Sequence, residues 1–322
     1  MKKGIKIMKS LHVLGILALT GLMCLLGCSK NTGPSTTATA AGQKTPSQKP
    51  TTQPTNVLPS AQEERAIADF AKLGIRVVVT TFPDTPDKPG LWVDFQDTTD
   101  LKGGLARLKE LNNVETLSFW NTKVSDAGLA DIEGLKQLRD LNLWNTDISD
   151  AGLEHLKGLH QLQNLRLIRT KLTDTGLEQL KGLTKLSTLA LSDTAVTDAG
   201  LAKLKGLENL QNLDLMNTKV TDVGIKHLKD LTQLRQLTLG NTKLTDAGLE
   251  HLEGLDELVN LGLSDTKVTD AGLEHLKGLN KLEWLNLKGT AVTYGGVKTL
   301  QKSLPHCHIS HTDNDWTLPR SP

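Results

Sequence analysis

The stretch LENLQNLDLMNTKVTDVGIKHLKD, residues 207–230, sets the predicted architecture, because the chain repeats it with small changes from Leu111 to Lys302. Eight copies of 24 residues align without a gap, and the seventh, residues 255–278, reads LDELVNLGLSDTKVTDAGLEHLKG. Aliphatic residues or Phe occupy positions 1, 4, 7, 9, 14, 19 and 22 of almost every copy. Self-similarity at this period predicts a solenoid in which each unit buries its apolar face against its neighbours.

Each copy is expected to contain one strand and one short helix. Positions 6 to 10 alternate between inward and outward residues, as in Asn212–Met216, which is the period of a β-strand. Thr at position 12 of every copy is expected to hydrogen-bond the backbone where the chain leaves the strand. Asp at position 16 of seven copies is predicted to be the N-cap of the helix, and Gly at position 24 of six copies suits the turn that ends it.

The pattern resembles that of the leucine-rich-repeat family, and specifically its 24-residue versions with a T-D-A-G-L segment, here residues 245–249. The family motif LxxLxLxxN is matched with Thr in place of Asn, and the resemblance covers about two-thirds of the chain. It implies an α/β solenoid curved like a horseshoe. Parallel strands would stack about 4.8 Å apart on the concave face, with short helices on the convex face and a cap at each end.

The chain on either side of the eight copies, residues 60–110 and 303–322, is predicted to cap the solenoid. The N-terminal elements, in order, are a helix that starts with a capping box at Ser60–Glu63 and stops at Gly74, a strand at Ile75–Thr81, a turn-rich stretch at Pro83–Gly90 and a degenerate repeat with a strand at Leu91–Phe95. At the other end, Leu304–Ile309 is predicted to supply a last strand with Cys307 and Ile309 inward, and the tail beyond Trp316 is expected to be loose.

The N-terminus has the features of an export signal with a lipid acceptor. Four lysines in the first nine residues precede a largely apolar run, Leu11–Gly27. The run ends in LLGC, residues 25–28, which resembles the bacterial lipobox, in which a small residue precedes the cysteine that is diacylated. The resemblance implies that residues 1–28 are a lipoprotein signal segment and that Cys28 anchors the protein to a membrane. The alternative is an uncleaved transmembrane anchor, and either arrangement would hold the body outside the cytoplasm, in the cell envelope.

Residues 29–59 are predicted to be a disordered linker. They are rich in Thr, Ser, Pro, Gln, Ala and Lys, and they contain no aromatic or acidic residue. Such a composition cannot bury enough apolar surface to offset the entropy of ordering. A flexible chain of this length spans on the order of 30 Å, which would hold the folded body away from the membrane.

Composition and motifs exclude several classes of function. A net charge of +1 gives no bulk attraction to nucleic acid. Two of the three cysteines, Cys24 and Cys28, lie in the N-terminal segment, so no disulfide framework involving Cys307 is expected. The sequence has no G-x-S-x-G, no phosphate-binding glycine loop, no HExxH and no CxxC pair. We therefore expect neither enzyme activity nor a cofactor.

The strand positions that point to solvent supply the candidate binding residues. Position 10 carries, from the degenerate repeat onward, Gln96, Trp120, Trp144, Ile168, Ser192, Met216, Gly240, Ser264 and Lys288. Exposed Trp is strongly enriched in binding hot spots, and charged residues usually frame such a patch. The predicted binding residues are Trp92, Trp120, Trp144, Arg166, Ile168, Met216 and Trp284. The alternative is that Trp120 and Trp144 stack on each other and on Ile168 only to stiffen the sheet.

Two groups of histidines could bind a metal ion. The first is at position 21 and comprises His155, His227, His251 and His275, and copying of the repeat explains it without any selection for ligands. The second is the C-terminal cluster of His306, Cys307, His308 and His311. Alternation along a strand would direct His306 and His308 away from Cys307, which disfavours a single site that uses all of them.

We expect the concave face to bind another protein, which would make the chain a membrane-tethered scaffold. A carbohydrate or cell-wall ligand is the alternative, because tryptophan platforms also stack on sugars. A third hypothesis, an intracellular ubiquitin-ligase adaptor, comes from the similar T-D-A-G-L repeats of F-box proteins. It is disfavoured because an export signal stands in place of an F-box-like segment.

Overall fold

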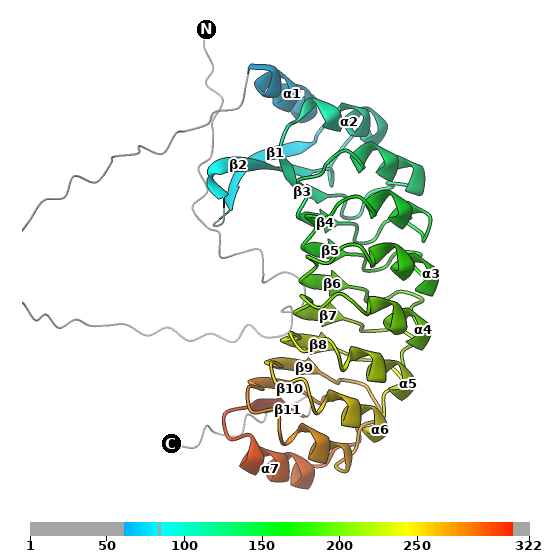
Figure 1. The fold of residues 1–322 in the computed structure, drawn as a ribbon, viewed down its shortest axis with the longest axis vertical. Coiled ribbons are helices and arrows are strands. Elements are labelled where there is room, and N and C mark those ends of the chain that lie inside the picture. The colour runs from blue at the N-terminus through cyan, green and yellow to red at the C-terminus, as the bar shows by residue number, and fades with distance from the viewer. Residues whose placement is uncertain (1–60, 83–84, 312–322) are drawn as a thin grey trace, which may run out of the picture. The chain divides into compact units, whose positions relative to one another are not determined.

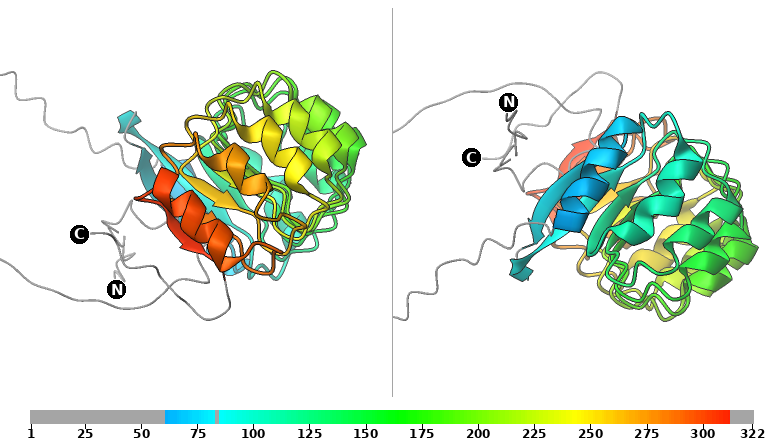
Figure 2. Two further views of the ribbon diagram at one scale, coloured as in Figure 1. Left: turned by 90° about the horizontal axis from the view of Figure 1, so that it is seen from below. Right: turned by 90° about the horizontal axis from the view of Figure 1, so that it is seen from above.

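In the described part of the chain, residues 61–82 and 85–311, eleven strands form one sheet whose spatial order follows the sequence order. The computed structural model contains the predicted solenoid within the unit Gln53–Pro322. The first two strands pair antiparallel, and every later strand pairs in parallel with its predecessor. Strands line the inner side of the repeat stack and helices the outer side in Figure 1, and the end-on views in Figure 2 show the same two layers.

The strands are β1 (Arg76–Phe82), β2 (Thr85–Asp94), β3 (Val114–Ser118), β4 (Asp140–Asn142), β5 (Asn164–Arg166), β6 (Thr188–Ala190), β7 (Asn212–Asp214), β8 (Gln236–Thr238), β9 (Asn260–Gly262), β10 (Trp284–Asn286) and β11 (His308–Ser310). The α-helices are α1 (Ala61–Lys72), α2 (Leu101–Arg107), α3 (Asp174–Leu177), α4 (Asp198–Leu201), α5 (Asp222–Ile225), α6 (Asp246–Leu249) and α7 (Tyr294–Ser303). The 3-10 helices are η2 (Leu108–Glu110), η3 (Asp126–Ile132), η4 (Gly152–Leu156), η5 (Glu178–Leu180), η6 (Ala202–Leu204), η7 (Lys226–Leu228), η8 (Glu250–Leu252) and η9 (Gly272–Leu276).

The core lies between the sheet and the helices and is built mainly of leucine. Leu117, Leu141 and Leu165 lie side by side in register and are fully buried, as position 7 predicts. At the N-terminal end the core is aromatic, and the rings of Phe95 and Phe119 have centroids 4.8 Å apart. Each such side chain contributes roughly 1.5–3 kcal/mol on burial. The repeats therefore share one continuous core.

The recurrent Thr at position 12 closes the turn after each strand. Its hydroxyl donates to the carbonyl three residues earlier in all eight copies, as from Thr218 to Leu215 at 2.6 Å. The expected bond to the backbone is confirmed. It lies within each repeat, so Thr does not link one repeat to the next.

The recurrent Asp at position 16 makes that link, which corrects the prediction that it is the N-cap. The helix α4 begins at Asp198, and its N-cap is Thr197, whose hydroxyl accepts from the Ala199 N–H. The carboxylate of Asp174, one repeat earlier, accepts from the Thr197 backbone N–H at 2.8 Å and from the Thr197 hydroxyl at 2.6 Å. Every Asp of the series repeats this pair of bonds with the Ser or Thr 23 residues later. We call this series the Asp–Thr ladder.

Glycine at position 18, within the T-D-A-G-L segment, leaves room for this ladder. A Cβ placed on Gly200 would lie 2.4 Å from Asp174 Oδ1, and the same conflict recurs at 2.1–2.5 Å in the other repeats that follow an Asp. A Cβ at Gly254, at position 24, would meet nothing within 4 Å. The segment is thus copied because one repeat's glycine accommodates the previous repeat's carboxylate.

The N-terminal cap differs from its prediction in one element. Gly74 ends α1 with φ +74°, as expected, but Thr85–Gly90 belongs to the strand β2 instead of forming turns. This part of β2 pairs with β1, and no other described strand lies along its second edge, whereas Leu91–Asp94 also pairs with β3. An edge strand tolerates prolines because their missing N–H groups need no partner there. The helix α2, which Asp100 caps, was not predicted.

The C-terminal end closes the solenoid. Position 16 of the last copy is Tyr294 instead of Asp, and it opens the longer helix α7, so the Asp–Thr ladder ends with the Asp270–Thr293 pair. The last strand, β11, lies at the end of the predicted segment, and Cys307 and Ile309 are buried as predicted. Burial raises the pKa of the Cys307 thiol to about 12.

Several predictions concern residues outside the described part of the chain. These are the signal segment with Cys28, the linker at residues 29–59, the start of the capping box at Ser60, the turn at Pro83 and the tail beyond Trp316. Within the described residues, no helix is long and apolar enough to cross a membrane.

Candidate functional site

Two of the predicted binding residues, Trp120 and Trp144, form a stacked pair on the strand face. Their ring centroids lie 5.5 Å apart with 23° between the ring planes. The backbone sets this approach, because the Asn121 N–H donates to the Trp144 carbonyl at 2.9 Å. Trp120 keeps 39% of its surface exposed, and Trp144 is half-buried. The pair therefore combines the stacking of the structural alternative with the exposed apolar surface that a binding site needs.

The third large apolar residue of this row is covered. Ile168 is only 7% exposed, so the expectation that it stands in open solvent is wrong. It stands one repeat after Trp144 at the same position, so position 10 by itself does not ensure exposure. Met216, two repeats further along, is 37% exposed as predicted.

The other two predicted tryptophans lie elsewhere on the sheet. Trp92 is on β2, half-buried, and the Arg76 guanidinium lies 4.6 Å from its ring centroid. Trp284 is on β10, 42% exposed, with its ring centroid 4.5 Å from that of His308. The strands β3 to β9 separate β2 from β10, so Trp92 and Trp284 lie far from each other. Of the four predicted tryptophans, only Trp120 and Trp144 stack on each other.

Charged side chains on β4 and β5 adjoin the stacked pair. Asp140 accepts from Asn164 Nδ2 at 2.5 Å, and burial raises the pKa of its carboxyl against the effect of that bond and of the Arg166 charge. Burial lowers the pKa of Arg166, opposed by the attraction of Asp140. Arg166 Nε is buried and has no hydrogen-bond acceptor within the described residues. An unsatisfied buried donor costs roughly 1–3 kcal/mol, so this donor of Arg166 raises the free energy of the folded state. We call Trp120, Trp144, Arg166 and Ile168 the tryptophan–arginine patch.

Arg169, three residues after Arg166, has an unusual backbone conformation for its residue type. It occupies position 11, where φ is positive in all eight copies, and its own φ is 54°. The other seven copies carry Asn, Asp or Gly at this position. This left-handed conformation costs a residue with an ordinary Cβ roughly 1–2 kcal/mol. Its guanidinium is 3.2 Å from Asp193 Oδ2. Strained residues of this kind gather at functional sites, and this one borders the tryptophan–arginine patch.

The sequence analysis missed the acidic partners of two neighbouring arginines. Glu115, almost fully buried, lies 3.4 Å from Arg139, and Asp193 pairs with Arg169. A signal was present in the sequence, because each pair places opposite charges at the same repeat position of successive copies. Residues at one position lie side by side in the sheet, so such charges are expected to attract each other.

Two of the four recurrent histidines bond to a carboxylate of the preceding repeat. His155 Nδ1 lies 2.5 Å from Glu133, and His275 Nδ1 lies 2.6 Å from Glu253. In the C-terminal cluster, His311 Nε2 lies 2.6 Å from the Val292 carbonyl. No group of three or more His, Cys, Asp or Glu residues among those described is arranged to hold a metal ion.

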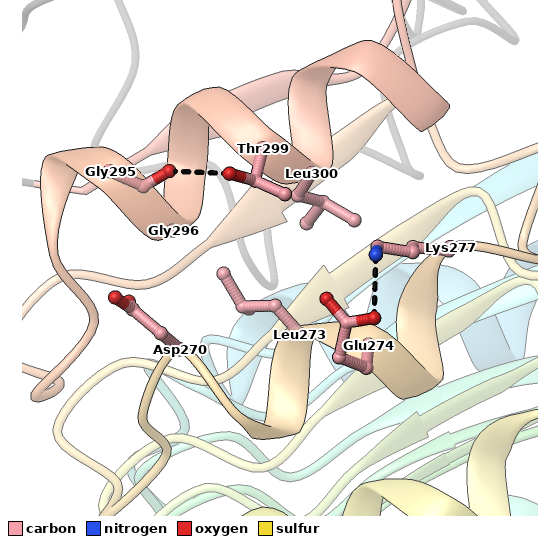
Figure 3. Close-up of a pocket in the computed structure, with 8 residues that line it drawn as sticks. All are labelled: Asp270, Leu273, Glu274, Lys277, Gly295, Gly296, Thr299 and Leu300. Carbon is pink, nitrogen blue, oxygen red and sulfur yellow. Dashed lines mark hydrogen bonds and ion pairs between the residues drawn. The ribbon is translucent and has the colours of Figure 1, made fainter.

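A small pocket lies between η9 and α7, on the helix side of the last repeat (Figure 3). Its volume is about 210 Å³, and its lining residues are Asp270, Leu273, Glu274, Lys277, Gly295, Gly296, Thr299 and Leu300. Its polar groups bind one another: Glu274 pairs with Lys277 at 2.6 Å, and Asp270 bonds to Thr293. The pocket therefore offers no unsatisfied group for catalysis.

Comparison with known proteins agrees with this geometry. A family profile described as Leucine Rich repeats (2 copies) matches residues 208–254, and one described as Leucine Rich repeat matches residues 182–205. No curated protein matches the chain. The repeat pattern, the sheet and these matches define a leucine-rich-repeat protein, a class built as a repeat scaffold, and no enzyme family is found.

Two solved structures extend the likeness. An internalin C2 from Listeria monocytogenes is 30% identical with a TM-score of 0.52, over 63% of this chain and 82% of that one. A leucine-rich-repeat protein from Leptospira interrogans is 23% identical with a TM-score of 0.51. That likeness covers 64% of this chain and half of the other, and it bears on the fold alone. The chain belongs to the leucine-rich-repeat proteins and is structurally similar to bacterial members of that class.

Proposed function

We propose that this protein is a scaffold that binds a protein partner through its strand face, with the tryptophan–arginine patch at the contact. The observation that carries the proposal is the stacked pair of Trp120 and Trp144, which keeps apolar surface in water. The other six copies carry Ile, Ser, Met, Gly, Ser and Lys at the same position, so no other copy has an aromatic residue there. Trp and Arg are the residues most enriched in binding hot spots, and a rigid sheet needs little ordering on association.

The ring geometry favours a protein over a sugar as the partner. A sugar stacks on an open aromatic face. In the pair, the near-parallel indoles of Trp120 and Trp144 each cover one face of the other, and Ile168 follows Trp144 in the row. The exposed apolar surface of Trp120 suits the apolar side chains of a peptide segment.

The test is affinity capture with the full chain as bait, repeated with Trp120→Ala and Trp144→Ala. Both variants are expected to lose the captured protein while circular dichroism reports an unchanged folded fraction. Val223→Ala is the matched control, because Val223 is a 58% exposed apolar residue at the helix side, on α5. Capture that survives both tryptophan variants, or binding to peptidoglycan or polysaccharide that depends on them, would contradict a protein partner at this patch.

We also propose that the body is tethered to a membrane in the cell envelope through lipid on Cys28. The support is the basic start, the apolar run and the LLGC sequence at residues 25–28. In a bacterial host, the wild-type chain is expected to incorporate labelled fatty acid and to enter the detergent phase on Triton X-114 partition. Cys28→Ala should do neither. Equal labelling of the two proteins would refute the lipid anchor.

A further inference from the structure

Arg166 differs from the arginines around it in having no partner for its buried donor. Arg139 faces Glu115 at 3.4 Å, and Arg169 faces Asp193 at 3.2 Å. The Nε–H of Arg166 is buried and finds no acceptor among the described residues. Its nearest attraction is to Asp140, whose carboxylate already accepts a 2.5 Å bond from Asn164. The Nε–H itself is closed to outside groups, but the Arg166 side chain as a whole is only half-buried, so a carboxylate from outside can still pair with the charge of the guanidinium.

Departures from the repeat pattern concentrate around this guanidinium. Position 8 is Arg only in the third copy, and position 10 is Trp in the first two copies and Ile in the third. Position 11 of the third copy is Arg169, in a left-handed conformation that Asn, Asp or Gly adopt in the other copies. Copying a repeat would not produce these residues, so their clustering on β3 to β5 marks a surface with its own role.

We propose that Arg166 binds the carboxylate of an Asp or Glu side chain on the partner protein, with an adjacent apolar side chain against Trp120 and Trp144. The inference rests on the proposed function and specifies the chemistry of the partner. The planar guanidinium matches a carboxylate, and a charge-assisted bond gains strength where water is excluded. The edges of the indole pair, next along the strands, supply the apolar part of the contact.

The surrounding charges select a singly charged acceptor. Asp140, on β4, already opposes the charge of Arg166. A phosphate would bring up to two further negative charges beside that carboxylate, whereas a carboxylate brings one. Stacking covers one face of each indole, which reduces the open ring surface that the sugar rings of an acidic polysaccharide would need.

The test selects short random peptides on the immobilised full chain and measures the affinity of the winners for five proteins. These are the wild type, Arg166→Met, Arg166→Lys, Trp120→Ala and the control Arg235→Met. Arg235 is exposed, directly before β8. Arg166→Met keeps an unbranched apolar stem and removes the guanidinium with its charge. Arg166→Lys keeps the charge beside Asp140 and removes the planar fork, and it serves if Arg166→Met fails to fold.

The winners are expected to share an Asp or Glu next to an apolar residue. Their affinity should fall at least tenfold with Arg166→Met, by less with Arg166→Lys, and hardly at all with Arg235→Met. Replacing the acidic residue by its amide should weaken binding to the wild type but not to Arg166→Met. Arg166→Lys keeps the charge beside Asp140, so it should retain the wild-type unfolding midpoint while it weakens binding, which a purely structural arginine would not allow.

Three results would overturn the proposal. Winners that need Trp120 but contain no acidic residue, or that bind Arg166→Met as well as the wild type, would refute the carboxylate and leave the protein-binding surface standing. Winners that are indifferent to Trp120→Ala, or no winners at all, would refute both. Displacement of the winners by an acidic polysaccharide but not by free acidic peptides would assign the guanidinium to a carbohydrate.

Discussion

The Asp–Thr ladder and the tryptophan–arginine patch lie on the same repeats but differ in how the sequence treats them. The ladder is copied from Asp126 to Thr293 with hardly a change, and each copy makes the same two bonds to the next repeat. The patch occupies three strands and has no counterpart on the others. Repetition therefore identifies what joins the units, and departure from repetition identifies what the surface is used for.

The two regions also differ in how their polar groups are satisfied. Each ladder carboxylate accepts two hydrogen bonds at the edge of the stack, whereas Arg166 keeps a buried donor without an acceptor in the described residues. The first arrangement lowers the free energy of the folded state, and the second raises it. Variants in the ladder should consequently change stability, and variants in the patch should mainly change binding.

The largest effect is expected from a side chain placed in the ladder. Gly200→Ala puts a Cβ 2.4 Å from Asp174 Oδ1, which two bonds to Thr197 hold in place. We expect a loss of about 2–4 kcal/mol in the free energy of unfolding measured by urea titration. Gly254→Ala, where the new Cβ meets nothing, should be close to neutral. Equal losses of stability in the two variants would contradict the claim that glycine at position 18 makes room for the ladder carboxylate.

A smaller effect is expected from removing the carboxylate itself. Asp174→Ala deletes both bonds to Thr197 and should cost about 2 kcal/mol. In that background Gly200→Ala should cost less than it does alone, because its closest contact is gone and the remaining ones, at 2.9 and 3.0 Å, are to the side-chain carbons Leu177 Cδ1 and Val196 Cγ1. The double-mutant cycle measures this coupling. Additive costs would show that Gly200 is conserved along the repeats for another reason.

A pH-dependent effect is expected on the strand face. Burial raises the pKa of Asp214, which also accepts from the Ser192 hydroxyl and the Met216 N–H. The folded state thus favours the protonated carboxyl of Asp214. The stability that this preference contributes is lost as pH rises from the usual pKa of an aspartate through the raised pKa in the folded state. Asp214→Asn keeps a hydrogen-bond acceptor but does not titrate. As pH rises across this range, the unfolding temperature of the variant should therefore increase relative to that of the wild type. Thermal unfolding at a series of pH values would refute the assignment if the two curves stayed parallel.

The smallest effect, of opposite sign, is expected on the helix side. Lys181 and Lys203 lower the pKa of Glu178 to about 2, and all three side chains are well hydrated. The pairing stabilises the fold above the usual pKa of 4.5, and that contribution is lost as pH falls towards 2. Glu178→Gln should lose only this slight acid dependence, and molar salt should abolish the difference. A salt-resistant difference would show that the pair is more than a surface contact.

The fold followed from the sequence because translation by 24 residues fixes which residues become neighbours. The inward leucines, the recurrent Thr and the last strand lie where the pattern placed them. The predicted role of Asp at position 16 was wrong. An acidic residue at the start of a helix suggests a bond within that helix, whereas its partner here is 23 residues away, in the next repeat. The ladder becomes visible only when successive copies are set side by side.

The candidate site was less predictable than the fold. Position alone indicated which strand residues point outward, but it did not determine their exposure, since Ile168 is buried at the position where Trp120 and Met216 are exposed. Equal positions also do not make a patch when the residues lie on distant strands, as with Trp92 and Trp284. The unsatisfied donor of Arg166 depends on side-chain geometry that no spacing rule contains.

The most direct test measures affinity and stability on the same double variant, Trp120→Ala with Trp144→Ala, using a peptide selected on the full chain. We predict that the affinity falls at least tenfold while the free energy of unfolding falls by less than it does in Gly200→Ala. A drop in stability as large as that of Gly200→Ala, with the affinity of the folded fraction unchanged, would contradict the account. The two indoles would then be part of what joins the repeats.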